Sequence, residues 1–439
     1  MSLRPLILSC IALLFACNQS TAPKDNFNDL AEKYVRLGLS IGQYDSDFVD
    51  AYYGPDSLKP KTTKLDAFPK DSLLKLVDDL KFEFKKYTDS SNQNDTIRRR
   101  AVWITKQLTA FSRRIKIFSG ELKSFDEEAL EIFDVKVPDY SEDNFKALVA
   151  ELDKSLPGKG SISERVDQLA NRFIIPKEKV DTVFKAAIEE ARKRTHSHYD
   201  LPQEESFTLE YVNNKPWSGY NWYKGNYHSV IQINLDVPIY IDRAIDLACH
   251  EGYPGHHVYN MMLEKNLYHD KGWVEISLYP LFSPQSLIAE GSANYGIDLS
   301  FPGTEKNTFT KSKLLPLAGL DSTNLDLYYK VISIKGQLNY VRNEVARGLL
   351  SGSMTDSVAT KWLTQYALMS PLIASKSISF IRKYRAYVIC YNYGQELVKN
   401  FVEHNGGLVT VPNKRWQVFG WLLSNPVTPT DLIQDKPIP

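Results

Sequence analysis

The sequence predicts a mainly α-helical protein with one small antiparallel β-sheet. Apolar residues recur every three to four positions through most of the chain, which is the spacing of a helix that buries one face. A short region after residue 200 instead alternates apolar and polar residues, which is typical of strands. The chain has 439 residues, enough for a large core and two lobes.

Helices account for most of the expected elements. A first helix is expected from Asn26, and a second from Asp71 with the apolar residues Leu73, Leu76, Leu80 and Phe84 facing inward. The other expected helices cover residues 96–120, 141–156, 177–198, 287–299, 325–350, 356–367 and 378–402.

Two strands are expected at residues 207–212 and 229–235. The aromatic, glycine-containing stretch 217–227 between them is expected to form a turn. The second strand directly precedes a helix that opens near Ile239 and leads into the histidine motif. An extended substrate that pairs with the edge of this strand would bind along Ile231, Gln232 and Asn234.

The N-terminus predicts export. Arg4 precedes an apolar run from Leu6 to Phe15, which is shorter than the roughly 20 residues needed to span a bilayer. The run ends at Ala16-Cys17, a pattern typical of bacterial lipoprotein signals, in which the cysteine becomes the acylated first residue. A plain secretory signal is the alternative. We therefore expect a protein of the cell envelope, periplasmic or surface-facing, that is anchored to a bacterial membrane only through a lipid on Cys17.

These patterns divide the chain into four parts: a signal peptide (1–16), a lipidated cysteine with its tether (17–25), a helical N-terminal lobe (26–200) and a catalytic lobe (201–439). Lys plus Arg and Asp plus Glu both number 53, so the charge balance does not favour nucleic acid as a partner. Apart from the signal region and Cys17, only Cys249 and Cys390 remain. Two buried free thiols are expected, and a disulfide between them is the alternative.

Three of the eight histidines stand in the segment His250-Glu251-Gly252-Tyr253-Pro254-Gly255-His256-His257. A neutral imidazole is the commonest metal ligand in proteins, and a glutamate directly after a ligand histidine can take a proton from an attacking water. Burying this segment would be costly without a metal or full hydrogen bonding. We therefore predict a site for one zinc ion, with His250 as a ligand and Glu251 as the general base.

The second ligand histidine requires an interrupted helix. In an HExxH motif the two histidines lie four residues apart on one helix face, but that position is Pro254 here. His256 would lie about 9 Å along a regular helix and on another face. If Pro254-Gly255 bulges out of the helix, His256 recovers the ligand position. His257 is the alternative ligand; otherwise it contacts a ligand or the substrate.

Glu290 is the best candidate for the third ligand, which leaves the fourth position to water. Small residues surround it in the sequence, and Asn294, one helical turn further on, is placed to orient a ligand histidine.

A cluster of tyrosines and arginines follows near residue 385. Tyr387 and Tyr391 share a helix face and are candidates to stabilise an oxyanion, whereas Arg385 is a candidate to hold a substrate carboxylate. A tyrosine-lined core helix is the alternative for each of them.

These motifs resemble a known family. Gln232-Ile-Asn-Leu235, the stretch 248–257 and Glu290-Gly-x-Ala-x-Tyr295 are similar to the bacterial domain of unknown function 885 family, and Val49–Pro55 resembles its N-terminal part. The resemblance implies an exported, mostly helical lipoprotein with a gluzincin-like fold. It also implies zinc at His250, His256 and Glu290 with Glu251 as base, but it implies no substrate.

The function expected is that of a zinc metallopeptidase acting on a peptide or small amide. One alternative is a zinc hydrolase of non-peptide amides or esters. Another is a catalytically inactive helical lipoprotein that binds a ligand or partner, although a structural zinc site needs no carboxylate like Glu251 beside its ligand. The sequence leaves open exo- or endo-cleavage and the oligomeric state.

Overall fold

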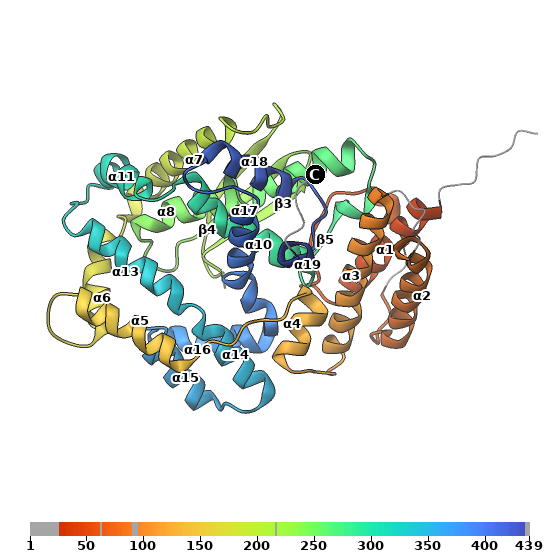
Figure 1. Ribbon diagram of the computed structural model, residues 1–439, viewed down its shortest axis with the longest axis horizontal. Helices are drawn as coiled ribbons and strands as arrows, with labels where there is room; N and C mark the ends of the chain where they lie inside the picture. The colour runs from red at the N-terminus through yellow and green to blue at the C-terminus, as the bar shows by residue number, and fades with distance from the viewer. Residues whose placement is uncertain (1–25, 62–63, 90–94, 216, 435–439) are drawn as a thin grey trace, which may run out of the picture.

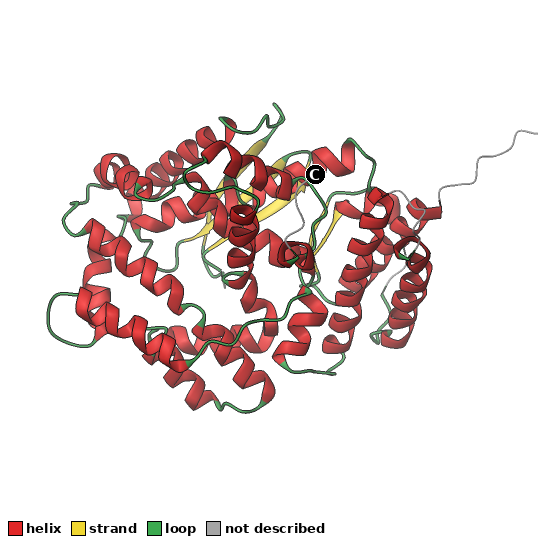
Figure 2. Cartoon of the chain, in the orientation of Figure 1, coloured by secondary structure: helices red, strands yellow, loops and turns green. Residues whose placement is uncertain are grey.

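A computed structural model describes residues 26–61, 64–89, 95–215 and 217–434. Most of this chain is helical and only a few short strands are present (Figure 2), so the predicted fold class is confirmed. The predicted signal peptide, Cys17 and the tether lie outside the described residues. No helix in the described ranges is both long and apolar enough to span a bilayer.

The first half of the chain forms amphipathic helices. They are α1 (Asn26–Gly42), α2 (Lys70–Thr88), α3 (Asp95–Phe118), α4 (Phe125–Phe133), α5 (Glu142–Ser155), α6 (Ile162–Ala170) and α7 (Val180–His196). In α2 the buried stripe includes Val77, whereas Leu76, expected to face inward, is 50% exposed. Adjacent helical residues lie about 100° apart, so the two cannot both face the core.

The second half contains the remaining helices. They are α8 (Ile241–Leu247), α9 (His256–Leu263), α10 (Pro284–Ser300), α11 (Glu305–Phe309), α12 (Leu315–Ala318), α13 (Leu325–Leu338), α14 (Val341–Ser351), α15 (Asp356–Gln365), α16 (Pro371–Tyr384), α17 (Tyr393–His404), α18 (Pro412–Leu423) and α19 (Pro429–Ile433). Two helices expected to be continuous are broken: 325–350 is split into α13 and α14, and a 3₁₀ turn at Arg385–Cys390 separates α16 from α17.

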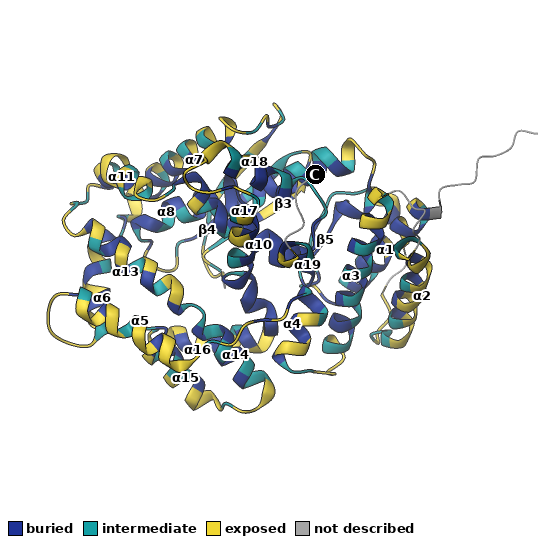
Figure 3. Cartoon of the chain, in the orientation of Figure 1, coloured by how far each residue is buried: buried dark blue, intermediate teal, exposed yellow. Residues whose placement is uncertain are grey.

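Helix α10 lies at the centre of the molecule (Figure 1) and is buried along nearly its whole length (Figure 3). It packs against α17, α9 and α3, so both halves of the chain contribute to its surroundings. Elsewhere α7 packs on α8 and α5 packs on α13. Helices from the two sides of residue 200 pack directly against each other. The division of the chain into two lobes at that residue stays a prediction.

A three-stranded sheet lies beside the motif. It consists of β2 (Ser206–Val212), β3 (Gly219–Gly225) and β4 (His228–Asn234), with β4 in the middle, parallel to β2 and antiparallel to β3. The stretch expected to be a turn is therefore largely the strand β3. Its residues alternate between buried and exposed from Asn221 onward, as strand residues do. The expectation of an antiparallel sheet is therefore wrong in part: the two expected strands, β2 and β4, run parallel, and only the inserted strand β3 runs antiparallel to β4, so the sheet is mixed.

A second, two-stranded sheet joins distant parts of the sequence. Strand β1 (Val49–Tyr52) pairs antiparallel with β5 (Leu278–Pro280), just before α10. This pairing brings residues near position 50 to the region of the histidine motif.

Candidate metal centre

The histidine motif spans a break between two helices. After α8, a π-helical segment at Ala248–Gly252 carries His250, the chain then turns, and α9 begins at His256. The two imidazole rings lie with their centroids 4.7 Å apart and their planes nearly perpendicular. The Pro254-Gly255 pair thus interrupts the helix, as predicted, although a new helix starts after it and the pair is not a bulge in one continuous helix.

Gly255 makes this turn sterically possible. Its amide donates to the carbonyl of Cys249 over 2.9 Å. A Cβ atom on Gly255 would lie 2.0 Å from the carbonyl oxygen of His250, far inside van der Waals contact. Only glycine fits this close backbone approach, which places His256 beside His250.

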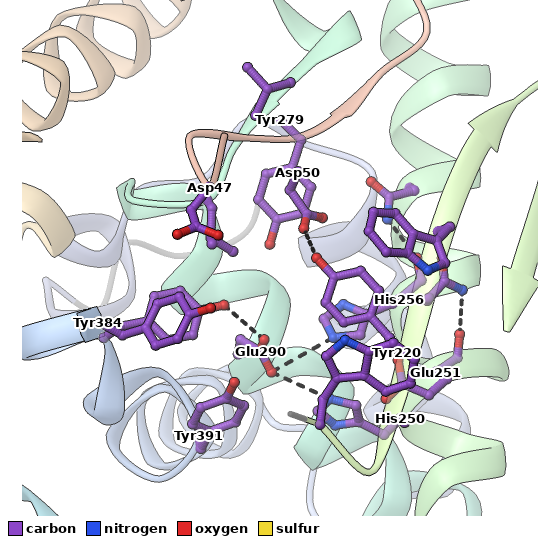
Figure 4. A pocket seen from close by; sticks show the side chains of 18 of the residues that line it. Asp47, Asp50, Tyr220, His250, Glu251, His256, Tyr279, Glu290, Tyr384 and Tyr391 are labelled. Carbon is purple, nitrogen blue, oxygen red and sulfur yellow. Dashed lines mark hydrogen bonds and ion pairs between the residues drawn. The ribbon is translucent and has the colours of Figure 1, made fainter. Parts of the chain in front are cut away.

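Glu290 reaches the two histidines from α10. Its Oε2 atom lies 3.3 Å from Nε2 of His250 and 3.7 Å from Nε2 of His256 (Figure 4). These three ligand atoms lie within 4.8 Å of one another. Zinc binds nitrogen and oxygen at about 2.0–2.2 Å in tetrahedral sites, which corresponds to ligand atoms about 3.3–3.6 Å apart. The separations of the Glu290 oxygen therefore fit a common metal ion.

The hydrogen bonding of Glu290 also fits a metal. Oε2 is buried and accepts no hydrogen bond of acceptable geometry from any described residue, whereas Oε1 accepts one from the Tyr387 hydroxyl over 2.9 Å. A buried carboxylate oxygen without a partner is costly. The residues present thus satisfy the requirements of a zinc site with two histidines and one glutamate.

Electrostatics couple the three candidate ligands. Burial alone would raise the pKa of Glu290, but its contacts with His250 and His256 outweigh burial and hold that pKa well below the usual range. Burial conversely opposes charge on His256, yet Glu290 and Glu251 raise its pKa to about 9. The carboxylates around the histidines therefore favour a positive charge at this point, either a proton or a metal ion.

Asn294 orients the first histidine. Its Oδ1 lies 3.0 Å from Nδ1 of His250, and its Nδ2 donates to the carbonyl of Tyr391 over 2.8 Å. Because the amide thus acts as acceptor towards the ring, Nδ1 carries the proton and Nε2 is free to bind a metal. This is the contact that the sequence spacing suggested for Asn294.

Glu251 is buried directly beside this cluster. Its backbone carbonyl accepts from Nδ2 of Asn221 over 2.7 Å, whereas its carboxylate lines the cavity and has no hydrogen-bond donor among the described residues. Gly219 of β3 lies over the carboxylate, where a Cβ atom would approach Oε1 to 3.1 Å. Burial raises the pKa of Glu251, and the nearby histidines partly offset this.

His257 does not belong to the metal cluster. It is fully buried, with Nδ1 2.8 Å from the Ser229 hydroxyl and Nε2 3.0 Å from Glu205. Adjacent helical residues point about 100° apart, so when His256 faces Glu290 its neighbour faces β4. The alternative of His257 as a ligand or substrate contact is therefore wrong, and its contacts are structural.

Two other expectations need correction. Arg385 does not face the cavity: its Nε donates to Glu128 over 2.6 Å and its Nη2 to the carbonyl of Lys123 over 3.0 Å, so its charge is used in a buried ion pair. Strand β4 has no free edge, because β2 and β3 pair with its two sides.

The three β4 residues expected to bind substrate instead pack in the core or stabilise the sheet and the loop before β3. Ile231 is buried in the core, Gln232 bonds side chains of both neighbouring strands, and Asn234 donates to the carbonyls of Lys215 and Trp217. The free edge beside the cavity belongs to β3.

The tyrosine cluster lies at the site, although Tyr387 is on the 3₁₀ turn and Tyr391 is in the short turn before α17, so the two do not share one regular helix. Tyr387 holds Glu290, and burial raises the pKa of its phenol, so the hydroxyl remains a donor. Tyr391 lines the cavity (Figure 4), and its hydroxyl forms no hydrogen bond with the described residues. Both residues line the cavity, but only the Tyr391 hydroxyl is without a hydrogen bond to a described residue.

Sequence reasoning missed a carboxylate from β1. The Asp50 side chain points into the cavity and accepts a hydrogen bond from the Tyr220 hydroxyl of β3 (Figure 4). Burial raises the pKa of Asp50 to about 6, although the Tyr220 hydrogen bond and His256 act in the opposite direction. No local signal marked Asp50, because it reaches the site only through the pairing of β1 with β5.

Two cavities meet at the metal cluster. The first, of about 360 Å³, contains Asp47, Asp50 and Tyr220; the second, of about 700 Å³, lies between β3, α14 and α16. His250, Glu251 and Tyr391 line both cavities. A molecule that extends through both cavities would pass beside His250, Glu251 and Tyr391.

Comparisons with known proteins concern the fold. No protein-family model matches the sequence, and no curated protein matches it. Among solved structures, a candidate lipoprotein from Colwellia psychrerythraea superposes with a TM-score of 0.51 at 14% identity, covering 83% of this chain and 68% of that chain. This likeness shows a shared fold.

Two further structures superpose less closely. One is an M32 carboxypeptidase from Deinococcus radiodurans R1, with a TM-score of 0.48 and 11% identity, covering 93% of this chain and 94% of that chain. The other is a candidate lipoprotein of unknown function from Shewanella oneidensis, with a TM-score of 0.47 and 12% identity, covering 83% of this chain and 72% of that chain.

The predicted thiols agree with the structure. Cys249 and Cys390 are both buried and both free, so the alternative of a disulfide between them is wrong. Burial raises the pKa of each thiol. Neither is therefore a thiolate ligand or nucleophile at neutral pH.

Proposed function

We propose that this chain is a zinc-dependent hydrolase that cleaves peptide bonds, with His250, His256 and Glu290 as ligands and Glu251 as general base. One observation carries the proposal: the Oε2 atom of Glu290, which accepts no hydrogen bond of acceptable geometry from the described residues, converges with two histidine Nε2 atoms beside a buried carboxylate that faces the same cavity. A structural zinc site would not need that carboxylate.

Zinc, when bound, acidifies the attacking water and polarises the scissile carbonyl. Glu251 takes a proton from the water on its carboxylate as the new carbon–oxygen bond forms. It then delivers that proton to the nitrogen as the carbon–nitrogen bond breaks. The raised pKa of the buried Glu251 suits a group that both accepts and returns a proton.

Two neighbouring groups assist. The Tyr391 hydroxyl is free to donate to the developing oxyanion. The edge of β3 that is not paired with another described strand offers backbone groups to an extended peptide, a role that the sequence assigned to β4.

We further propose that the protein belongs with the domain of unknown function 885 family and is exported as a lipoprotein acylated at Cys17. The motif residues support the family, and Leu14-Phe15-Ala16-Cys17 supports the lipid. Hydrolysis of non-peptide amides or esters is the second candidate, because the acid–base chemistry of Glu251 is the same for both.

The test combines metal analysis with hydrolysis. The mature protein is reconstituted with zinc, its bound metal is counted, and it is incubated with a mixed peptide library that is read by mass spectrometry. One zinc per chain is expected, together with cleavage that Glu251→Gln abolishes while retaining the metal. The matched control is Glu178→Gln, which removes an exposed carboxylate far from the cluster in sequence and should remain active. A wild-type protein that binds no zinc would refute the proposal.

A further inference from the structure

The two cavities beside the metal cluster differ in charge. The smaller one contains the carboxylates of Asp47 and Asp50 and one lysine, Lys383, which is paired with Asp47 over 2.9 Å. The larger one is lined by the basic residues Arg243, Arg342 and Lys376. Its acidic residues are Asp246 and Glu251, and Glu251 also lines the smaller cavity. An anionic group of a bound molecule is therefore directed to the larger cavity.

Arg342 is the unusual cation in the larger cavity. Arg243 is paired with Asp246 over 3.5 Å, and Lys376 is exposed to solvent. Arg342 forms no ion pair with any described residue, and its Nε is buried without a hydrogen-bond acceptor. Its guanidinium lies 5.4 Å from the ring centroid of Phe380. Burial lowers the pKa of Arg342, which reflects a charge that has lost water without gaining a carboxylate.

Ser377 supplies a second unused donor to the same cavity. The residue is 7% exposed, and its hydroxyl has no hydrogen-bond partner among the described residues. It lies on α16 one turn before Phe380, and therefore on the same face of that helix. Helix α16 packs against α14, which carries Arg342. Buried donors are normally satisfied, so two of them at one wall indicate a missing acceptor.

Tyr391 connects this wall to the metal cluster. It lines both cavities, and its phenol interacts electrostatically with both Glu290 and Arg342. The two unused donors therefore belong to the cavity that opens directly beside the proposed ligands.

We propose that Arg342 and Ser377 bind the free C-terminal carboxylate of a peptide, so that the protein removes residues from the carboxyl end. This inference rests on the proposed peptidase function and specifies its substrate class. A guanidinium and a hydroxyl match the two oxygens of a carboxylate. The apolar side chains of Met369, Ile373 and Phe380 in the same cavity favour an apolar terminal residue.

The geometry assigns the two products. Hydrolysis adds the elements of water across the scissile bond: the new carboxyl group forms on the fragment in the smaller cavity, and the nitrogen of the terminal residue receives the proton. The released amino acid leaves from the larger cavity, with its own carboxylate on Arg342. A C-terminal amide carries no charge for Arg342 to bind, so it should be a poor substrate.

The experiment compares two acetylated tetrapeptide libraries, identical except for a C-terminal carboxylate or a C-terminal amide. The zinc-loaded protein should release single residues from the acid library at least tenfold faster than from the amide library. Arg342→Gln should lower kcat/KM for the acid library about 10- to 100-fold, since a hydrogen bond to a charged group is lost, and should abolish the preference for acid over amide. Ser377→Ala should give a smaller loss in the same direction, and Arg382→Gln, which removes an exposed arginine on α16, should give none.

A binding measurement separates the two proposals. Calorimetry with acetyl-glycyl-phenylalanine and its amide on zinc-loaded Glu251→Gln should show binding of the acid that Arg342→Gln removes. If no library is cleaved but this binding holds, the peptidase proposal fails and the carboxylate site stands. If the wild type cleaves or binds acid and amide equally, the carboxylate site is refuted.

The unfolding temperature distinguishes an arginine that binds a ligand from an arginine that stabilises the fold. Because the Arg342 Nε is buried without an acceptor and the side chain has no ion pair with a described residue, Arg342→Gln should leave the unfolding temperature unchanged or raise it. Arg385→Gln, which leaves Glu128 buried without its partner, should lower it. A marked loss of stability in Arg342→Gln would mean that Arg342 serves the fold and would refute its assignment to a ligand.

Discussion

Gly291 of α10 faces Gly394 of α17 so closely that a Cβ atom on Gly291 would lie 2.3 Å from the Gly394 carbonyl oxygen. Gly291 directly follows Glu290, so this contact fixes the depth at which the carboxylate enters the metal cluster. It also explains the small residues around Glu290 in the sequence, since the two helix backbones approach each other closely there.

Gly291→Ala should therefore destabilise the protein by about 1–3 kcal/mol, the usual range for overpacking a core. It should also weaken zinc binding, because α10 must shift to relieve the overlap. Urea unfolding and chelator competition measure the two effects. Gly336→Ala is the matched control for stability: Gly336 is helical with nothing near its missing Cβ atom, so alanine should stabilise by about 0.4–1 kcal/mol.

Replacing Asn294 with alanine should lower zinc affinity about 10- to 100-fold, as is usual when the residue that orients a ligand histidine is removed. The reason is that His250 loses the acceptor that keeps its Nδ1 protonated. Competition with a calibrated zinc chelator gives the affinity. Unchanged affinity would show that the ring is held by other contacts.

The two adjacent histidines should respond oppositely to alanine substitution. His256→Ala should remove a ligand and nearly abolish zinc binding, with little loss of stability in the metal-free protein. His257→Ala should leave zinc affinity within about twofold and cost about 1–3 kcal/mol of stability, because Ser229 and Glu205 lose a buried partner. Equilibrium unfolding of both apo proteins, alongside zinc titration, distinguishes the roles; a loss of zinc in His257→Ala would contradict this assignment.

Glu205 should make stability depend on acid pH. Burial opposes its ionisation, but hydrogen bonds from His257, Tyr253 and Arg192 outweigh burial and lower its pKa to about 2. A glutamate in the unfolded chain has a pKa of about 4.3. A depressed folded pKa contributes stability that is present above the unfolded pKa and is lost as pH falls towards the folded pKa.

The stability advantage of wild type over Glu205→Gln should accordingly be constant near neutral pH and shrink between pH values of about 5 and 2. Urea unfolding at a series of pH values measures the difference between the two proteins. A difference that does not change across this window would mean that the ionised form is not favoured in the folded state.

Local patterns were sufficient for much of this structure. The amphipathic helices followed from apolar spacing, and the juxtaposition of His250 and His256 followed from the conflict between a helix and Pro254-Gly255. Asn294 followed from one turn of helix beyond Glu290. The helices and the histidine pair depend on neighbours close in sequence, whereas Asn294 meets His250 across 44 residues and was placed only by its spacing from Glu290.

Non-local contacts account for what local reasoning missed. Arg385 is paired with Glu128, which is 257 residues away, so its sequence neighbourhood suggested an available charge that the fold does not leave. Asp50 and Arg342 reach the cavities only through the pairing of β1 with β5 and the packing of α14 on α16. The aromatic stretch that forms β3 contains Gly219 and Gly225, which locally favour a turn, and it becomes a strand only by pairing with β4.

Strand β1 contributes Asp50 to the cavity wall, so the cavity is complete only when β1 has paired with β5. Asp50 lies in β1, whereas Tyr387 and Tyr391 lie between α16 and α17, and both groups border the same cavity although several hundred residues separate them in the sequence. Contacts between such distant segments form slowly in folding, because the entropy of closing a long loop opposes them. A chain that lacks either of these two segments, such as a nascent chain, therefore has the histidine motif but not the enclosed cavity. Any activity should accordingly switch on only when synthesis and folding are complete.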